Sequence, residues 1–299
     1  MKTSNFHVVY IPVSGVGIPK RNKKWLEYRI KIFKEYTLKS LLNQTERNFT
    51  LWLSFTEKER YNDSVQELVN YLVSLKMPFL ITYNGLSYHD DKFSRGLVTK
   101  LLNIARILRS CWRERSLENL LGIKEIIKDK NKTLEKRLEK SLSQFASWVI
   151  HPDKVLLTRI DSDDMFHEDA VERIQKAAKQ ARGEYEYGAL VFKSGLVYNK
   201  NMGELAEWNP RTNPPFHTII FPADKFFNAK KHLEHYKGYK SHEDIPKLFK
   251  TTLLPNGRYC VLVHSVKNQI STIWNHPFRG QKMNDELLKD FGLEKVSHY

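Results

Sequence analysis

Residues 155–166 read VLLTRIDSDDMF, and this stretch decides the predicted fold. The apolar run over 155–157 is typical of a buried strand. Three acids follow within four positions: Asp161, Asp163 and Asp164. Like charges this close repel each other unless a cation binds between them or water solvates them. The stretch therefore leaves two interpretations open, a metal-bound diphosphate site and a solvated acidic turn.

The apolar pattern on both sides of this stretch alternates between strand and helix periodicity. In chain order it predicts strand 7–13, helix 25–43, strand 49–55, helix 65–75, strand 79–83, helix 93–108, strand 155–160 and helix 167–182. Such alternation predicts an α/β sheet with parallel neighbouring strands. Later strands are expected near 187–193, 217–221 and 259–264, with turns between them and a polar, helical tail after Gly280. Ligands of open α/β sheets bind beyond the carboxyl ends of the strands, where the acids lie.

Composition limits the class of protein. The 299 residues are 41% hydrophobic, which is enough for a folded core and excludes a disordered chain. The net charge of +15 favours acidic partners, including nucleoside diphosphates, anionic lipids, acidic polysaccharides and nucleic acids. The two cysteines, Cys111 and Cys260, form no zinc or C-x-x-C pattern, which favours a reducing compartment. No window has the roughly 18 consecutive apolar residues that a membrane span requires, and no signal peptide is evident.

Residues 109–147 interrupt the strand–helix rhythm. They carry ten Lys and Arg residues against six Asp and Glu residues, on a helical but weakly apolar pattern. This composition predicts a charged helical insertion with one exposed side. Its basic surface could rest on anionic lipid or hold an anionic acceptor, and a merely solvated face is the alternative.

Two other motifs that contain paired acids do not fit the acidic stretch. An EF-hand loop that began at Asp161 would have Met165 and Phe166 where an oxygen ligand and a glycine are required. A phospho-aspartyl phosphatase would have Thr or Val two residues after Asp163, and Met165 stands there instead.

Strand, Thr-Arg-Ile-Asp-Ser-Asp-Asp and helix together resemble the D-x-D segment of GT-A glycosyltransferases, and especially the bacterial "putative rhamnosyltransferase" family. A second stretch is similar to the R-x-x-x-F-x-x-Y-T-x-x-S-x-x-x-Q helix of that family, matched at Arg29, Phe33, Tyr36, Thr37, Ser40 and Gln44. A third, looser likeness is His264, Asn268 and Ser271, which resemble a late H-x-x-N-x-S segment. The resemblance implies a GT-A-like mixed sheet flanked by helices and nucleotide-sugar chemistry.

The resemblance also implies a divalent cation, Mn²⁺ or Mg²⁺, at the acidic stretch. Both are hard cations that take one or two carboxylates together with substrate phosphates. By analogy with GT-A enzymes we expect Asp163 to be the main ligand, supported by Asp161, Asp164 and His264. A histidine at the end of an apolar strand is otherwise usually structural.

Further residues are candidates for the nucleotide-sugar site through the same resemblance. They are Arg29, Asp90, Asp91, Arg95, Arg159 and Asp161. A surface ion pair is the alternative for Arg29, and a helix N-cap is the alternative for the Asp90-Asp91 pair. The loop 14–18 could line the nucleotide, but its glycines do not make a dinucleotide motif.

The general base is expected in the segment Ser-His-Glu-Asp-Ile-Pro at 241–246. Inverting glycosyl transfer requires a carboxylate that takes the proton of the acceptor hydroxyl. GT-A enzymes often place it in a Glu-Asp pair that begins a helix, which favours Asp244, with Glu243 as the second choice. A capped helix start is the alternative. The loop at Asn213 is expected on the acceptor side, or as a plain turn.

The sequence thus predicts one GT-A-like catalytic domain over 1–299, with a nucleotide-binding half 1–165, an acceptor-side half 166–281 and a tail 282–299. The expected activity is metal-dependent, inverting transfer of a hexosyl or deoxyhexosyl group from a UDP- or dTDP-linked donor to a glycan or lipid-linked glycan. The expected location is the cytoplasm, with peripheral contact at the inner face of the membrane, and no nucleic acid is expected as a partner. The rival hypothesis is a non-enzymatic binder of polyanions or nucleic acid, which rests on the +15 charge alone because the sequence holds no known nucleic-acid motif.

Overall fold

The structure is a computed structural model. It describes residues 5–14, 23–85, 101, 104, 105, 108, 109, 134–146, 152–237, 239, 242–264, 281–282 and 285–293. The predicted helix 93–108 lies largely outside this part of the chain, as does most of the insertion 109–147.

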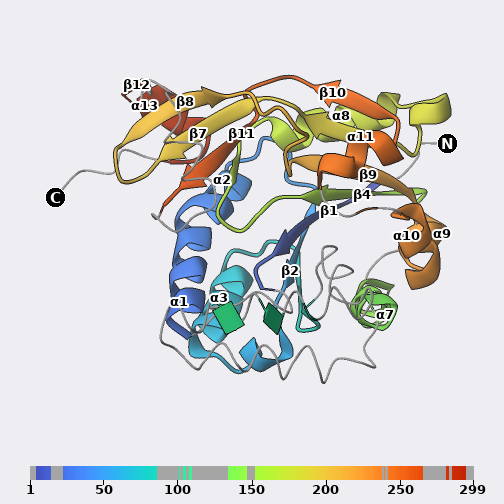
Figure 1. Ribbon diagram of the computed structural model, residues 1–299, viewed down its shortest axis with the longest axis horizontal. Helices are drawn as coiled ribbons and strands as arrows, with labels where there is room; N and C mark the ends of the chain where they lie inside the picture. Colours follow the sequence, from blue (N-terminus) through green and yellow to red (C-terminus); the bar gives the residue numbers. More distant parts are fainter. Residues whose placement is uncertain are drawn as a thin grey trace.

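The larger sheet has seven strands in the order β10-β6-β9-β4-β1-β2-β3 (Figure 1). Its strands are β1 (Asn5–Pro12), β2 (Thr50–Ser54), β3 (Phe79–Thr82), β4 (Lys154–Arg159), β6 (Ala189–Phe192), β9 (His217–Pro222) and β10 (Thr251–Leu254). Strands β3, β2, β1 and β4 run parallel, and β9 is antiparallel to both β4 and β6. The predicted parallel neighbours are therefore confirmed, and the reversed β9 makes the sheet mixed, in agreement with the GT-A-like fold class.

A smaller five-stranded sheet has the order β12-β8-β7-β11-β5. Its strands are β5 (Met165–Phe166), β7 (Gly195–Asn199), β8 (Glu204–Trp208), β11 (Tyr259–Val263) and β12 (Gln281–Lys282). The sequence predicts only β11 among them, and the turns expected after strand β6 are in fact the hairpin β7–β8. These strands are short, and β7 and β8 bury only part of their residues, so their apolar signal is weak.

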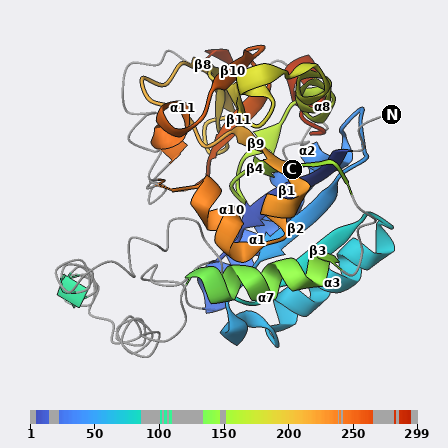
Figure 2. The same ribbon diagram turned by 90° about the vertical axis from the view of Figure 1, so that its right-hand side faces the viewer.

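Helices cover both faces of the larger sheet (Figures 1 and 2). The helical elements are α1 (Lys23–Ile32), η1 (Phe33–Thr37), α2 (Leu38–Leu42), η2 (Glu57–Glu59), α3 (Asp63–Ser74), α7 (Leu134–Ala146), α8 (Ala170–Gln180), η4 (Gly183–Tyr185), α9 (Ala223–Phe226), α10 (Ala229–His235), η5 (His242–Asp244), α11 (Ile245–Leu248) and α13 (Asp285–Lys289). The segment η1 is a π-helical turn that joins α1 and α2 into one rod.

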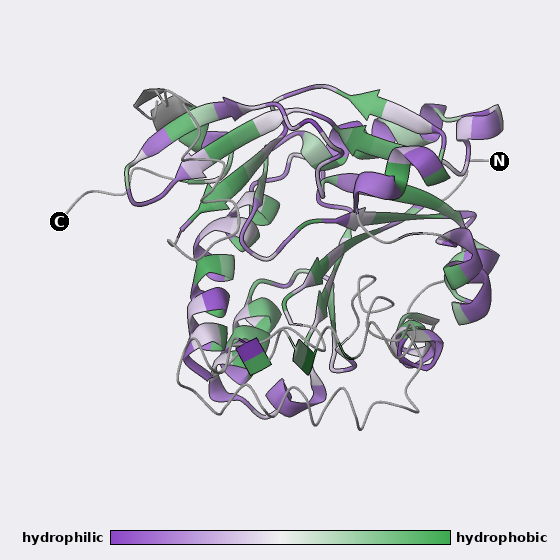
Figure 3. Cartoon of the chain, in the orientation of Figure 1, coloured by the Kyte–Doolittle hydropathy of each residue, from purple (hydrophilic) through white to green (hydrophobic). Residues whose placement is uncertain are grey.

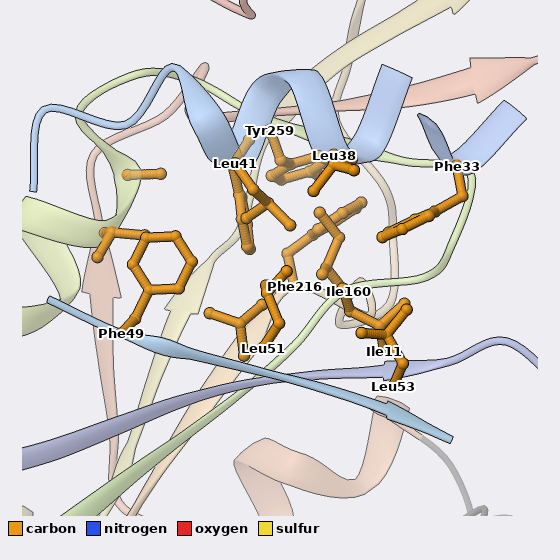
Figure 4. Close-up of a cluster of buried hydrophobic side chains, with 14 of the residues drawn as sticks. Ile11, Phe33, Leu38, Leu41, Phe49, Leu51, Leu53, Ile160, Phe216 and Tyr259 are labelled. Atoms are coloured by element: carbon orange, nitrogen blue, oxygen red, sulfur yellow. The ribbon is translucent and has the colours of Figure 1, made fainter. Parts of the chain in front are cut away.

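The period of two along β1 divides the core between these helices. Val9 and Ile11 face α1, α2, α3 and α8, and they join the main buried cluster, part of which is drawn in Figure 4. Val8 and Tyr10 point to the opposite face and pack with α7, α9 and α10. Figure 3 shows the result as mainly hydrophobic central strands between helices that carry both polar and apolar residues.

The described part of the insertion 109–147 is a regular core element on one side. Helix α7 buries Leu138, Leu142 and Phe145 against the sheet and lies next to α10 (Figure 2). The prediction of a helix with one exposed side is confirmed for 134–146. The weakly apolar pattern understated its packing, because three apolar residues at helical spacing are enough to form a buried stripe.

The C-terminal tail also contributes to the core. Leu288, Phe291 and Leu293 are buried against Ile32 and Tyr36 of the α1–η1 rod. Helix α13 confirms the expected helical segment, and this packing shows that the tail is not polar throughout. In the described part of the chain, no helix combines the length and the apolar composition that crossing a membrane demands.

Candidate functional site

The acidic stretch is the link between the two sheets. Strand β4 ends at Arg159 in the larger sheet, and β5 begins at Met165 in the smaller one, where it pairs with β11. The backbone N–H of Ile160 donates to Tyr10 O at 3.2 Å, which keeps the chain beside β1 as it leaves the sheet. The N–H of Asp164 then donates to Asp161 O at 3.2 Å and closes a turn. The acids thus lie at the carboxyl ends of parallel strands, as the sequence predicts, in the region where α/β sheets bind ligands.

Asp163 faces helix α1 and the end of β11. Its Oδ2 atom forms an ion pair with Arg29 Nη1 and lies 3.1 Å from His264 Nε2. Burial works to raise the pKa of Asp163, but the Arg29 charge and the hydrogen bonds from His264 and Arg29 outweigh it and lower the pKa to about 2. Asp163 is therefore ionised at neutral pH, although only 13% of its side chain is exposed.

Tyr28 holds His264 beside this carboxylate. The Tyr28 hydroxyl donates to the backbone oxygen of His264 at 3.0 Å, and His264 Nδ1 lies 3.2 Å from the same hydroxyl. The two rings are 5.4 Å apart between centroids. Sequence reasoning does not single out Tyr28, and its position one residue before Arg29 on α1 is the signal that could have indicated it.

Asp164 is buried and contacts the backbone of β11. The residue is 5% exposed, and its Oδ1 accepts a hydrogen bond from the N–H of Leu262 at 3.2 Å, beyond the point where β5 stops pairing with β11. Burial and the charges of Asp163 and Asp161 raise its pKa well above the usual value. Burial and like charge therefore disfavour the ionised form of Asp164, and its role as a supporting metal ligand stays a prediction.

Asp161 forms the second ion pair of the turn. Its Oδ1 lies 3.0 Å from Arg159 Nη2, and Arg159 Nη1 donates to Tyr239 Oη at 3.3 Å. Burial opposes the charged form of Arg159, but the nearby Asp161 charge offsets this and the pKa of Arg159 is raised. Two acids of the turn are therefore paired with arginines, Asp163 with Arg29 and Asp161 with Arg159. Protein cations thus relieve part of the repulsion between the acids, alongside the cation or water that the sequence analysis considered.

The predicted base lies within electrostatic range of Tyr239, the residue that accepts from Arg159 Nη1. Asp244 ends η5 and is the N-terminal cap position of α11, with Oδ1 3.4 Å from Lys247 Nζ. Its charge, like that of Asp161, raises the pKa of Tyr239, after the larger effect of burial. Asp244 and Asp161 therefore both lie within electrostatic range of one tyrosine. Glu243 lies in the same short helix.

Hydrogen bonds join the predicted acceptor-side loop to η5. His242 Nδ1 lies 2.6 Å from Asn213 O, and Asn213 Nδ2 donates to His242 O at 3.0 Å. Burial lowers the pKa of His242, which favours the neutral imidazole. The sequence indicated the Asn213 loop and the η5 acids separately, and the structure joins them through this reciprocal pair.

The rod α1–η1–α2 fixes the chain on the other side of the turn. Ser40 Oγ accepts from the N–H of Phe166 at 3.1 Å. Gln44 Nε2 donates to His167 O at 2.8 Å, and Gln44 Oε1 accepts from the N–H of Val171 at 3.0 Å. The motif letters Arg, Ser and Gln on this rod, which carried only a resemblance in the sequence, thus contact successive points of the segment that contains and follows the acids.

Three of the predicted nucleotide-site residues, Asp90, Asp91 and Arg95, lie outside the described residues. So do Asn268 and Ser271, and the loop 14–18 apart from Ser14. Ser14 ends the first strand region, where its hydroxyl donates to Glu59 and accepts from the N–H of Thr56 at 3.0 Å.

The donor atoms at the turn are compatible with a divalent cation that also binds phosphate. Among the residues that the structure describes, no group of three or more His, Cys, Asp and Glu side chains could hold a metal ion by itself. Asp163 does offer an ionised carboxylate with a partly exposed side chain, and His264 offers an imidazole nitrogen beside it. Mg²⁺ binds in this manner, through one or two carboxylates and substrate phosphates. The residues present therefore fit a phosphate-dependent site rather than a closed cage of protein ligands.

Comparison with known proteins finds one family match over part of the chain and similarity to solved structures. Residues 21–83 match the family described as "Putative rhamnosyl transferase", a segment of about a fifth of the chain that runs from before α1 to the end of β3. It contains the Arg29–Gln44 motif, in agreement with the resemblance seen in the sequence. No curated protein matches the chain.

Among solved structures, the chain is similar to the crystal structure of S. aureus TarS 1–349, with a TM-score of 0.40 and 13% identity over 86% of this chain. The crystal structure of the same protein in complex with UDP is similar at a TM-score of 0.40 and 12% identity over 87% of this chain. In both cases the chain spans 60% of the length of the solved chain.

Proposed function

We propose that the protein is a metal-dependent, inverting glycosyltransferase that moves a sugar from a nucleoside-diphosphate donor to a surface-glycan acceptor. The observation that carries this proposal is the acidic turn with two arginines, Arg29 and Arg159, at the carboxyl ends of parallel strands. The family similarity over 21–83 supports it independently. A diphosphate needs cations, and Arg29 and Arg159 supply two that are already oriented by carboxylates.

The residue roles follow from these positions. Arg29 and Arg159 would bind the diphosphate, because guanidinium groups match phosphate oxygens in charge and geometry. Asp161, which has a more exposed side chain (37%) than Asp163, would accept hydrogen bonds from the sugar or ribose. Asp244 would take the proton of the acceptor hydroxyl, with Glu243 as the second candidate.

Asp163 and His264 would hold Mn²⁺ or Mg²⁺. When bound, such a cation offsets the charge of the diphosphate leaving group as a Lewis acid. The protein's own contribution is to keep Asp163 ionised through Arg29 and to keep His264 oriented through Tyr28.

Donor and acceptor are proposed only by class. The donor would be UDP- or dTDP-linked, in line with the nucleotide-sugar chemistry that the resemblance to GT-A enzymes implies. The acceptor would be a glycan or a lipid-linked glycan, met on the cytoplasmic side of a membrane whose anionic surface attracts the net charge of +15.

Calorimetry of UDP and dTDP with Mn²⁺, and with EDTA in its place, tests the proposal. A ligand present at 100 times its Kd adds about 2.7 kcal/mol to the free energy of unfolding, so thermal unfolding gives a second readout. We expect metal-dependent binding of at least one nucleotide. Binding to heparin or DNA that ignores metal, without any nucleotide binding, would favour the rival polyanion binder instead.

A further inference from the structure

Two side chains, Arg29 and His264, meet on one oxygen atom of Asp163. Arg29 Nη1 and His264 Nε2 both contact Oδ2 of this carboxylate. The side chains are 20% exposed for Arg29, 7% for His264 and 13% for Asp163, so little water separates them. The carboxylate that is best suited to a metal is therefore already in contact with Arg29 and His264.

Arg29 occupies a position from which a positive charge interacts with all three acids of the turn. Burial disfavours its charge, but Asp163 first and then Asp161 and Asp164 stabilise the guanidinium. The guanidinium carbon also lies 5.4 Å from the centre of the Trp25 ring, one turn earlier on the same helix. Arg29 is thus held in place from its own helix and supplies one positive charge to the turn, beside that of Arg159.

A nucleoside diphosphate changes this balance. Guanidinium groups bind phosphate oxygens in a bidentate manner, so the diphosphate competes with Asp163 for Arg29. A divalent cation also needs those phosphate oxygens to complete its coordination. The same ligand can therefore remove the occupant of Asp163 and supply the missing metal ligands.

We infer that Arg29 is a built-in counter-cation that keeps a divalent metal off Asp163 until a nucleoside diphosphate draws the guanidinium away. The inference rests on the proposed function for its ligand, but it concerns a separate property, the order and coupling of binding. Because coupling between two ligands is reciprocal, the metal must raise the affinity for the diphosphate by the same factor as the diphosphate raises the affinity for the metal.

Titration of the full chain with Mn²⁺, without nucleotide and followed by calorimetry and by the loss of the free Mn²⁺ paramagnetic resonance signal, tests the inference. Wild type should bind Mn²⁺ weakly, and Arg29→Gln should bind it at least tenfold more tightly. The same variant should bind UDP in the presence of Mn²⁺ at least tenfold more weakly, because it has lost a phosphate ligand. If Arg29 had a purely structural role, Arg29→Gln would bind both Mn²⁺ and UDP more weakly than wild type.

Two further variants serve as controls. Arg29→Lys keeps the charge but not the bidentate geometry, so Mn²⁺ without nucleotide should bind it less tightly than Arg29→Gln. Arg182→Gln removes the same charge at the exposed end of α8 and should leave both affinities unchanged. Thermal unfolding checks that each variant is folded. If Arg29→Gln is not folded, the comparison of Arg29→Lys with wild type tests the inference instead. If UDP does not change the Mn²⁺ affinity of either protein, the inference is overturned.

The outcomes also separate the inference from the proposed function. If UDP and dTDP fail to bind wild type under any condition, the proposed function loses its donor. Mn²⁺ titration without nucleotide still reports whether Arg29 blocks Asp163. If nucleotides bind as proposed but Arg29→Gln takes up Mn²⁺ no better than wild type, the function stands and the counter-cation role is wrong.

Discussion

Asp161 and Asp163 lie two residues apart, and each faces an arginine, but the two pairs lie at different depths. The side chains of Asp163 and Arg29 are 13% and 20% exposed, and His264 closes the pair from the side of β11. The side chain of Asp161 is 37% exposed beside Arg159, and its charge, like that of Asp244, acts on Tyr239. An ion pair near water is weak and exchangeable, whereas a buried pair is costly to break from one side. The comparison therefore predicts that the Asp161–Arg159 pair exchanges partners more readily than the Asp163–Arg29 pair.

The largest expected effect is at the proposed base, Asp244. Asp244→Asn removes the proton acceptor and should slow transfer by roughly 10²–10⁴-fold, while UDP affinity stays within about twofold. Steady-state rates with calorimetry of UDP measure both quantities. Glu243→Gln is the matched control and should retain most of the activity. The reverse result would move the role to Glu243.

One substitution in each ion pair tests whether the two pairs differ in depth. Asp163→Asn leaves the charge of Arg29 buried without its partner and should lower the free energy of unfolding by about 3 kcal/mol or more. Asp161→Asn, in a partly exposed pair, should lower it by at most about 1 kcal/mol. Urea denaturation at pH 7 measures both.

The effect of Asp163→Asn should also depend on pH. The folded-state pKa of Asp163 is lowered to about 2, so its stabilisation is present above the unfolded pKa of about 4 and is lost as pH falls towards 2. The difference between wild type and variant should therefore shrink in acid. Equal costs for the two substitutions, at every pH, would contradict the distinction between a deep and an open pair.

The rod that carries Arg29 can be tested at Gln44. This side chain is buried, and its amide bonds His167 O and the N–H of Val171. Gln44→Leu leaves these groups without a partner and should lower the free energy of unfolding by about 2 kcal/mol. Gln66→Leu, which removes an exposed side chain bonded to Arg60 O, is the control and should cost less than half as much. If both cost the same, the rod does not fix the segment after the acids.

The smallest and opposite effect is expected at Asp164. Burial and the charges of Asp163 and Asp161 raise its pKa, so the folded protein binds a proton that the unfolded chain releases above about pH 4. Its stabilisation is complete below that pH and is lost as pH rises. Asp164→Asn keeps an acceptor for the Leu262 N–H without needing the proton, and should unfold at higher urea than wild type at pH 7.

This gain at Asp164 should itself vary with pH. It should vanish near pH 4, and it should grow by about 1.4 kcal/mol for each pH step of one over the range in which the carboxyl is protonated only in the folded protein. Urea denaturation of wild type and variant from pH 4 to pH 7 measures it. A loss of stability at pH 7 would mean that Asp164 is ionised in the folded protein.

Much of the larger sheet could be predicted because its strands are buried on both faces. Strands β1, β2 and β4 read as continuous apolar runs, and the helices between them show a period of 3.6. The smaller sheet could not, since β7 and β8 are short and half-exposed and β5 has only two residues. Strand β5 pairs with β11 across about 95 residues of chain, and no local pattern encodes that contact.

The sequence by itself determined that acids follow a buried strand at the carboxyl edge of a sheet, because burial and periodicity are local properties of the chain. It also determined the Arg29–Gln44 motif on one helix. Only the tertiary structure decided the burial and the partner of each of those acids. Asp163 is an ionised partner of Arg29, Asp161 a partly exposed partner of Arg159, and Asp164 a buried acceptor for the N–H of Leu262 in β11. The physical reason is that the ionisation of a carboxyl depends on its depth and on charges brought from distant parts of the chain, and three identical side chains in one turn acquire three different environments only when the chain folds.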